Sequence, residues 1–140
     1  MLDLTVNYKL GTIMRDIKFR AWDSDKSLMV QWDELIEEKG DPRDVGSYNL
    51  LSVILAGNSC GHNLMQFTGL RDCNGVCIYE GDIVDDNFVG VGEVIYNEKH
   101  AAFKIIYNDR ITAKWFIDML KRESRIIEVI GNIHQNPELL

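Results

Sequence analysis

Four residues near the middle of the chain have side chains that could bind a metal ion. They are Cys60, His62, Cys73 and Cys77. Thiolates and a histidine ring are typical zinc ligands, but the spacings C-x-H and C-x-x-x-C differ from the C-x-x-C pairs of common zinc sites. We therefore favour three ordinary free thiols, which suit a reducing cytoplasm, and we predict no cofactor. Whether the four residues converge in space depends on the tertiary structure.

The histidines could serve in acid–base chemistry, yet no catalytic motif surrounds them. His62, His100 and His134 are far apart along the chain, so only folding could bring one beside a nucleophile. The chain has neither the H-E-x-x-H pair of zinc proteases nor a Walker-type phosphate loop. We therefore expect a protein that is not an enzyme.

Three glycines at six-residue spacing offer a second kind of chemistry. Gly69, Gly75 and Gly81 could form a phosphate-binding loop, but such a loop needs a helix behind it, and a strand-like sequence follows Gly81. Glycine at these points instead favours tight turns in a small β structure. The pair Asn74-Gly75 predicts a hairpin turn with a positive φ at Gly75. Asp82 is expected to accept hydrogen bonds from backbone amides near the Gly81 turn.

A basic and aromatic cluster near the N-terminus could bind a single nucleic-acid strand. Arg15, Lys18, Arg20 and Trp22 combine cations with a stacking surface. The whole chain opposes this interpretation, since 15 basic residues against 22 acidic ones give a net charge of −7. That charge disfavours general binding to duplex nucleic acid or to an anionic membrane. Single-stranded DNA or RNA binding is kept as the alternative function.

The elements that must position these residues are mostly short strands. Alternation, apolar composition and turn signals predict strands, with a bend at Glu80-Gly81-Asp82. The predicted strands are Ile17–Trp22, Leu28–Val30, Leu50–Ala56, Leu64–Thr68, Val76–Tyr79 continuing at Ile83-Val84, Gly90–Tyr96, Ala101–Tyr107 and Ile126–Ile133. Helical spacing predicts helices over Trp32–Lys39 and Thr112–Glu123. The predicted core consists of Phe67, Leu70, Ile78, Ile83, Val84, Val94, Phe103, Ile105, Val129 and Ile130.

The first thirteen residues form an extension with an alternating pattern of its own. Leu4, Val6 and Tyr8 belong to one apolar face, which predicts a strand that adds to a sheet edge in this chain or in a second copy. The apolar stripe containing Trp115 and Phe116 is a second candidate for self-association. The alternative is that Met14 is the natural start and that the extension is a translated leader.

Three sequence blocks resemble the YopX family of bacteriophage and prophage proteins. The first block is Met14–Asp23 (MRDIKFRAWD), the second is Leu64–Asp72 with Asn74-Gly75 and Ile78–Val84, and the third is Ile127–His134 with Asn136–Leu140. Cys73, Val76 and Cys77 depart from the charged residues that are usual in the family at these positions. The structural signature within them is Gly69, Asn74, Gly75, Gly81, Asp82, Gly131 and Asn132. The resemblance implies a phage or prophage origin, a small barrel of the SH3 type in the C-terminal half, and self-association. It implies no established reaction.

Together these observations predict a mainly β (α+β) protein. The expected parts are an extension over residues 1–13, a strand and hairpin region over 14–63, and a small SH3-like β-barrel with one helix over 64–140. The predicted function is that of a non-enzymatic phage accessory protein in the bacterial cytoplasm. It would bind itself and an unidentified host or phage protein, and it would not bind a membrane. An enzyme of unknown chemistry is the third interpretation.

Overall fold

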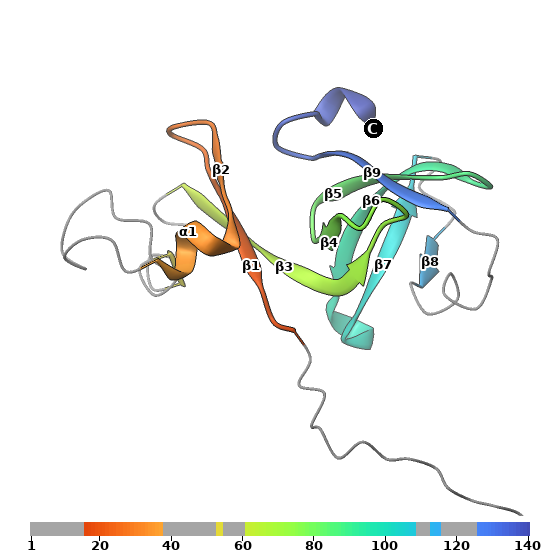
Figure 1. Ribbon diagram of the computed structural model, residues 1–140. Coiled ribbons are helices and arrows are strands. Elements are labelled where there is room, and N and C mark those ends of the chain that lie inside the picture. Colours follow the sequence, from red (N-terminus) through yellow and green to blue (C-terminus); the bar gives the residue numbers. More distant parts are fainter. Residues whose placement is uncertain (1–15, 38–52, 55–60, 109–112, 116–125) are drawn as a thin grey trace, which may run out of the picture.

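The computed structural model describes residues 16–37, 53–54, 61–108, 113–115 and 126–140. Over these residues the protein is mainly β, with two curled antiparallel sheets and the short α-helix α1 (Trp32–Ile36) (Figure 1). This confirms the predicted class. Several predicted features lie outside the described residues, namely the strand around Leu4, Val6 and Tyr8, the cation Arg15, the thiol Cys60, and Phe116.

The first sheet has four strands in the order β2-β1-β3-β4. Its strands are β1 (Phe19–Asp23), β2 (Leu28–Val30), β3 (His62–Arg71) and β4 (Cys77–Tyr79). Asp23 closes the β1–β2 turn because its carboxylate accepts the backbone N–H groups of Asp25 and Lys26. Helix α1 (Trp32–Ile36) follows β2 and buries Leu35 against Ala21, Val30 and Val53. We call this group the N-terminal cluster.

The second sheet has five strands in the order β8-β7-β6-β5-β9. They are β5 (Asp82–Asp86), β6 (Gly90–Asn97), β7 (Ala102–Tyr107), β8 (Ala113–Trp115) and β9 (Ile127–Asn132), with the 3₁₀ turns η2 (Glu98–His100) and η3 (Pro137–Leu139). The residues buried together are Ile78, Val84, Val94, Ile105 and Tyr107, and we call them the C-terminal cluster. Leu70, Phe103 and Val129 pack against it, and Phe67 and Ile83 are also buried.

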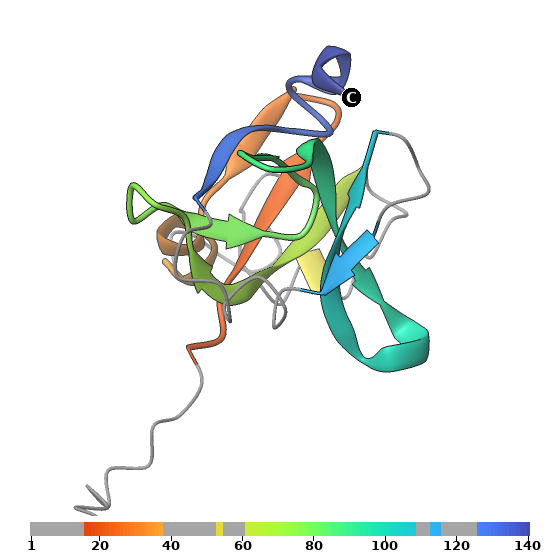
Figure 2. The same ribbon diagram turned by 90° about the vertical axis from the view of Figure 1, so that its right-hand side faces the viewer.

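Strand β3 connects the two halves of the molecule. Its first residues pair with β1, from His62 opposite Asp23 to Gln66 opposite Phe19, and its last residues pair with β4. The register shifts between Phe67 and Arg71, where Gly69 has a φ of +90°. Because β4 continues through a tight turn into β5, the N-terminal strands lie against the start of the second sheet (Figures 1 and 2).

Three sequence predictions are wrong within the described residues. Ala113–Trp115 is not helical but forms β8, because it pairs with β7, and the rest of the predicted helix Thr112–Glu123 lies outside the described residues. Val53 and Ile54 are helical, not part of a strand. Ile130 is 37% exposed, not in the core, because it is the extra residue of a bulge between the Ile83–Gly131 and Val84–Val129 pairs.

The predicted turn at Gly75 is confirmed. Gly75 has a φ of +83°, and its N–H donates to the carbonyl of Asp72. The Asp72 carboxylate accepts the N–H groups of Asn74 and Val76 through one oxygen and that of Val129 on β9 through the other. The hairpin therefore also holds the outer edge of β9. Burial acts to raise the pKa of Asp72, but these backbone donors outweigh it and lower the pKa below its usual value.

Candidate functional site

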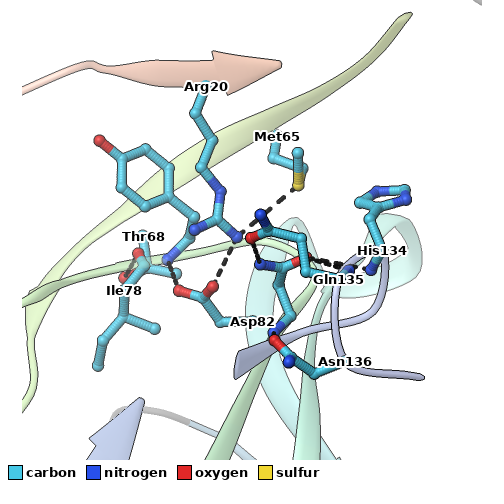
Figure 3. A network of polar contacts seen from close by, with 10 residues as sticks. Arg20, Met65, Thr68, Ile78, Asp82, His134, Gln135 and Asn136 are labelled. Atoms are coloured by element: carbon cyan, nitrogen blue, oxygen red, sulfur yellow. Dashed lines mark hydrogen bonds and ion pairs between the residues drawn. The ribbon is translucent and has the colours of Figure 1, made fainter. Parts of the chain in front are cut away.

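The two sheets meet at a buried ion pair. Arg20 comes from β1 and Asp82 from the start of β5, and a guanidinium nitrogen of Arg20 lies 2.5 Å from an Asp82 oxygen. Arg20 is 8% exposed and Asp82 is fully buried. The guanidinium also lies 4.8 Å from the centre of the Tyr79 ring and contacts the sulfur of Met65 (Figure 3). The pair therefore connects β1, β3, β4 and β5.

Asp82 is fixed by the backbone as well as by Arg20. Its second oxygen accepts the N–H of Tyr79 at 2.7 Å, which confirms that Asp82 binds a backbone amide beside the Gly81 turn. Burial raises the pKa of Asp82 above its usual value, although the charge of Arg20 and the Tyr79 N–H act in the opposite direction. Arg20 and Asp82 both hold strands together, so we assign the ion pair a structural role.

The C-terminal signature forms a tight turn that places His134. The Asn132 side-chain oxygen accepts the N–H groups of His134 and Gln135, and its amide nitrogen donates to the Gln135 side chain. Gly131 is required because a Cβ there would lie 2.6 Å from the Asn136 side-chain oxygen. The His134 ring stacks on Trp22 of β1, with 5.4 Å between ring centres and 10° between planes. Burial, with the nearby Arg20 charge, lowers the pKa of His134.

A pocket of about 200 Å³ opens beside this junction. Residues of β3, the β4–β5 turn, β6 and the C-terminal turn line it, so all four segments must be in place for it to exist. Its apolar lining consists of Leu64, Met65, Val94, Ile95 and Ile133, together with Gly81. Its polar lining consists of Asn63, Glu80, Glu93 and His134. We call it the junction pocket.

Gly81 keeps the junction pocket open at its base. Its φ is +76°, which favours glycine, and a Cβ at this position would lie 3.4 Å from both Met65 and Ile133. The Gly81 carbonyl accepts the Ile133 N–H, and its own N–H donates to the Val94 carbonyl. The turn is therefore tied to both walls of the pocket.

The described members of the predicted nucleic-acid cluster, Lys18, Arg20 and Trp22, lie in three different surroundings. Arg20 is buried and paired with Asp82, which argues against a contact between its guanidinium and nucleic acid. Lys18 lies 2.8 Å from the Asp16 carboxylate and packs over the Phe67 ring. Trp22 stacks on His134. Sequence reasoning missed Arg20's partner because the two residues are 62 positions apart.

The metal-site candidates also remain apart where they are described. Cys73 is an exposed free thiol at the β3–β4 turn and Cys77 a half-buried one on β4, whereas His62 lies at the start of β3 near Asp23. Among the described residues, no three histidine, cysteine or acidic side chains are placed to hold a metal ion. No helix within the described ranges is long and apolar enough to cross a membrane.

One catalytic spacing escaped the sequence analysis. Gly57-Asn58-Ser59-Cys60-Gly61 has the G-x-S-x-G pattern of a nucleophile elbow. That elbow needs a strand before the serine and a helix after it. Here Val53 and Ile54 before it are helical, and strand β3 begins directly after Gly61, so the described flanks do not fit the motif. The serine itself lies outside the described residues.

Comparison with known protein families shows to which family the chain is related. Residues 18–140 match the family described as YopX protein. The chain belongs to the YopX family. This confirms the resemblance carried by the three sequence blocks, and it covers every strand of both sheets.

Two solved structures agree with this membership. Protein EF1440 from Enterococcus faecalis is 30% identical, with a TM-score of 0.57 over 91% of this chain and 99% of that one. The protein yopX from Bacillus subtilis is 25% identical, with a TM-score of 0.52 over the same shares. No curated protein matches the chain. Membership in the YopX family therefore supports the fold and leaves the biochemical function open.

Proposed function

We propose that the protein is a non-enzymatic accessory protein of a phage or prophage that acts in the bacterial cytoplasm by binding itself and another protein. The observation that carries this proposal is a group of exposed apolar side chains at one end of the second sheet. Phe88 is 62% exposed, Val76 49% and Ile126 47%. We call these three residues the apolar rim.

The segments that carry the apolar rim meet around Ile127. Asp86, two residues before Phe88, pairs with Ile127 in the β5–β9 ladder, and the Cys73 N–H of the hairpin that contains Val76 donates to the Ile127 carbonyl. Exposed apolar groups carried by neighbouring segments are typical of protein-interaction surfaces. Since Asp72 already occupies the outer edge of β9, a partner would bind through the rim's side chains and not as an added strand.

Within this proposal the second sheet is a small barrel of the SH3 type. Its support is the five-stranded antiparallel order β8-β7-β6-β5-β9, with the β4 residue Ile78 packed into the same cluster. Membership in a fold class does not by itself assign a function. The apolar rim therefore carries the functional part of the proposal.

Light scattering over a concentration series tests self-association. We expect the mass of the wild-type chain to rise with concentration and the mass of an F88S/I126S double variant to stay at that of a monomer. Leu139→Ser is the matched control, since Leu139 is also exposed but lies on η3, away from the rim. A chain that begins at Met14 tests the extension with Leu4, Val6 and Tyr8 in the same assay. A wild-type chain that is monomeric throughout contradicts self-association.

The alternative, single-strand nucleic-acid binding, has weaker support. With Arg20 buried and Lys18 paired with Asp16, Trp22 is the remaining described member of the predicted cluster, and it faces His134. An anisotropy titration with a labelled oligonucleotide at two salt concentrations tests it. Binding that strengthens at low salt and weakens in a Lys18→Ala variant would favour nucleic acid over protein as the partner.

A further inference from the structure

We propose that the exposed face of β9 binds a basic segment of another protein, in which apolar side chains flank a cation. This face consists of Glu128 and Ile130 on β9, Ile126 directly before it, and Asp85 on the neighbouring strand β5 (Figure 1). We call it the β9 face. The inference rests on the proposed function, since it names the chemistry of the second protein that the proposed function leaves open.

Outward and inward residues alternate along this part of the chain. Ile126 is 47% exposed and Ile130 37%, and Glu128 between them is also exposed. Ile127 and Val129 instead pack against the C-terminal cluster. Alternate residues of a strand lie about 7 Å apart, so the β9 face presents an acid with an apolar side chain on either side of it. A protein that packs on this face can use both kinds of contact.

Two acids face each other across the β5–β9 ladder. Asp85 is the register partner of Glu128, and partners in an antiparallel ladder have their Cβ atoms about 4.5–5.5 Å apart on the same face. Like charges in this position destabilise a sheet. Glu128 accepts a hydrogen bond from the neutral Asn74 amide at 3.2 Å, and neither acid forms an ion pair in the part of the chain that the structure describes. A cation from a partner would offset their repulsion.

Two described cations of the neighbouring strands do not pair with these acids. Arg71 donates to a carbonyl group of the β3–β4 turn. Lys104 lies on β7, two strands away from β5, and stands opposite Ile95 of β6. Asp85 stands opposite Val91, four residues before Ile95, so Lys104 is about 14 Å further along the sheet. The negative charge of the β9 face is therefore open to a cation from outside.

The combination of charge and apolar surface selects a basic protein segment. Two carboxylates repel the phosphate groups of nucleic acids and of membrane lipids. A second copy of this chain is also disfavoured at this face, because its net charge is −7. A guanidinium has five donors in a fork, so one arginine can reach two neighbouring carboxylates. Aliphatic side chains beside it can cover Ile126 and Ile130.

An NMR titration of the full chain with the blocked peptide acetyl-GLSRSLG-amide tests the β9 face. The peptide has leucine, arginine and leucine at alternate positions, which matches the spacing of the face. We expect saturable shifts of the backbone amides of residues 85 and 126–130, and weaker binding as the salt concentration rises from about 50 mM to about 300 mM.

Two control peptides separate charge from apolar contact. Acetyl-GLSQSLG-amide lacks the cation and acetyl-GASRSAG-amide lacks the large apolar side chains. Each should bind about fivefold more weakly than the first peptide, because each loses one kind of contact. Equal binding of the three peptides, or shifts confined to other residues, would overturn the proposal.

Matched variants of the chain locate the interaction. The double variant D85N/E128Q should weaken binding of acetyl-GLSRSLG-amide by about tenfold. The new glutamine can still accept from Asn74, so the contact with the hairpin is kept. The control E98Q/E138Q removes the same charge from η2 and η3 and should leave binding unchanged. Equal weakening in both double variants would mean an effect of net charge and would overturn the assignment. If D85N/E128Q alters the fold, the comparison of the three peptides on the wild-type chain still decides.

Light scattering separates this inference from the proposed function. The D85N/E128Q variant keeps every residue of the apolar rim, so self-association through the rim should persist in it. A wild-type chain that associates but does not bind acetyl-GLSRSLG-amide would reject this inference and leave the proposed self-association standing. A wild-type chain that stays monomeric and binds the peptide would support the β9 face and contradict self-association.

Discussion

The four-stranded sheet builds its core with the help of a helix, whereas the buried core described for the five-stranded sheet consists of strand residues. The N-terminal cluster draws Ala21, Val30, Leu35 and Val53 from separate segments. The C-terminal cluster instead joins Ile78, Val84, Val94, Ile105 and Tyr107 from neighbouring strands, mostly β-branched residues that suit a pleated surface.

The buried acids show how each region is held. At the start of β5, where the two regions meet, Asp82 is paired with a cation from the other sheet. At the end of β5, Asp86 accepts the Tyr107 hydroxyl of β7 at 2.8 Å and the Phe88 N–H of the β5–β6 turn. Asp86 is thus satisfied within its own region, whereas Asp82 fastens the second sheet to the first through a buried ion pair.

The largest expected effect comes from breaking that fastening. Asp82→Ala leaves the Arg20 charge buried without its partner, so we expect a loss of about 3–5 kcal/mol in the free energy of unfolding. Urea denaturation followed by tryptophan fluorescence and circular dichroism measures it. The double variant R20M/D82L should recover much of the loss because no buried charge remains. Asp85→Ala, on the same strand, is the control and should change stability by less than about 0.5 kcal/mol.

Core truncation in each region comes next. Ile83→Ala in the second sheet and Leu35→Ala in the first should each cost about 2–5 kcal/mol, since both side chains are buried. If the ion pair couples the two sheets so that they unfold together, the fluorescence and circular dichroism transitions will coincide in both variants. Ile36→Ala, half exposed beside Leu35, serves as the control. A Leu35→Ala melt that shifts only the fluorescence transition would show that the regions unfold separately.

A smaller effect is expected at the β3–β4 turn. Gly75→Val should cost about 1–2 kcal/mol, because valine resists the left-handed backbone at this position. A Cβ at Gly75 would meet no atom within 4 Å, so the effect is one of conformation and not of crowding. Gly75→Asn should cost less, since asparagine tolerates positive φ. Equal thermal stability of the valine variant and the wild type would contradict the turn geometry.

The smallest effect concerns pH and the His134 contact between the regions. The pKa of His134 is lowered from its ordinary 6.5, so the unfolded chain binds more protons than the folded chain just below pH 6.5. Its contribution to stability is therefore present above pH 6.5 and is lost as the pH falls through the folded pKa. We expect the free energy of unfolding, measured by urea denaturation, to fall less for His134→Gln than for the wild type when the pH is lowered from 7.5 to 5.5. Parallel pH profiles would contradict this assignment.

The raised pKa of Asp82 acts with the opposite sign. Its contribution is present below the unfolded pKa and is lost as the pH rises through the folded value. The comparison of His134→Gln with the wild type separates the two, because Asp82 is present in both proteins.

The sequence by itself determined the strands and turns whose signals are local. Alternation predicted β6 and β7, Asn74-Gly75 predicted the positive φ of the β3–β4 hairpin, and three blocks identified the family. These features depend on residues that are neighbours in the chain, so a one-dimensional pattern contains them.

Tertiary structure decided everything that depends on residues distant in sequence. Arg20 looked like a surface cation until β1 and β5 placed it against Asp82. Ala113–Trp115 has helical spacing with the residues after it, yet the open edge of β7 makes it a strand. Ile130 follows the apolar pattern, but a bulge set by the pairing of β9 with β5 turns it outward. The junction pocket is formed by four segments that are distant in the sequence, so no local pattern predicts it. In each of the other cases, burial and long-range strand pairing override the secondary-structure preference of a short segment.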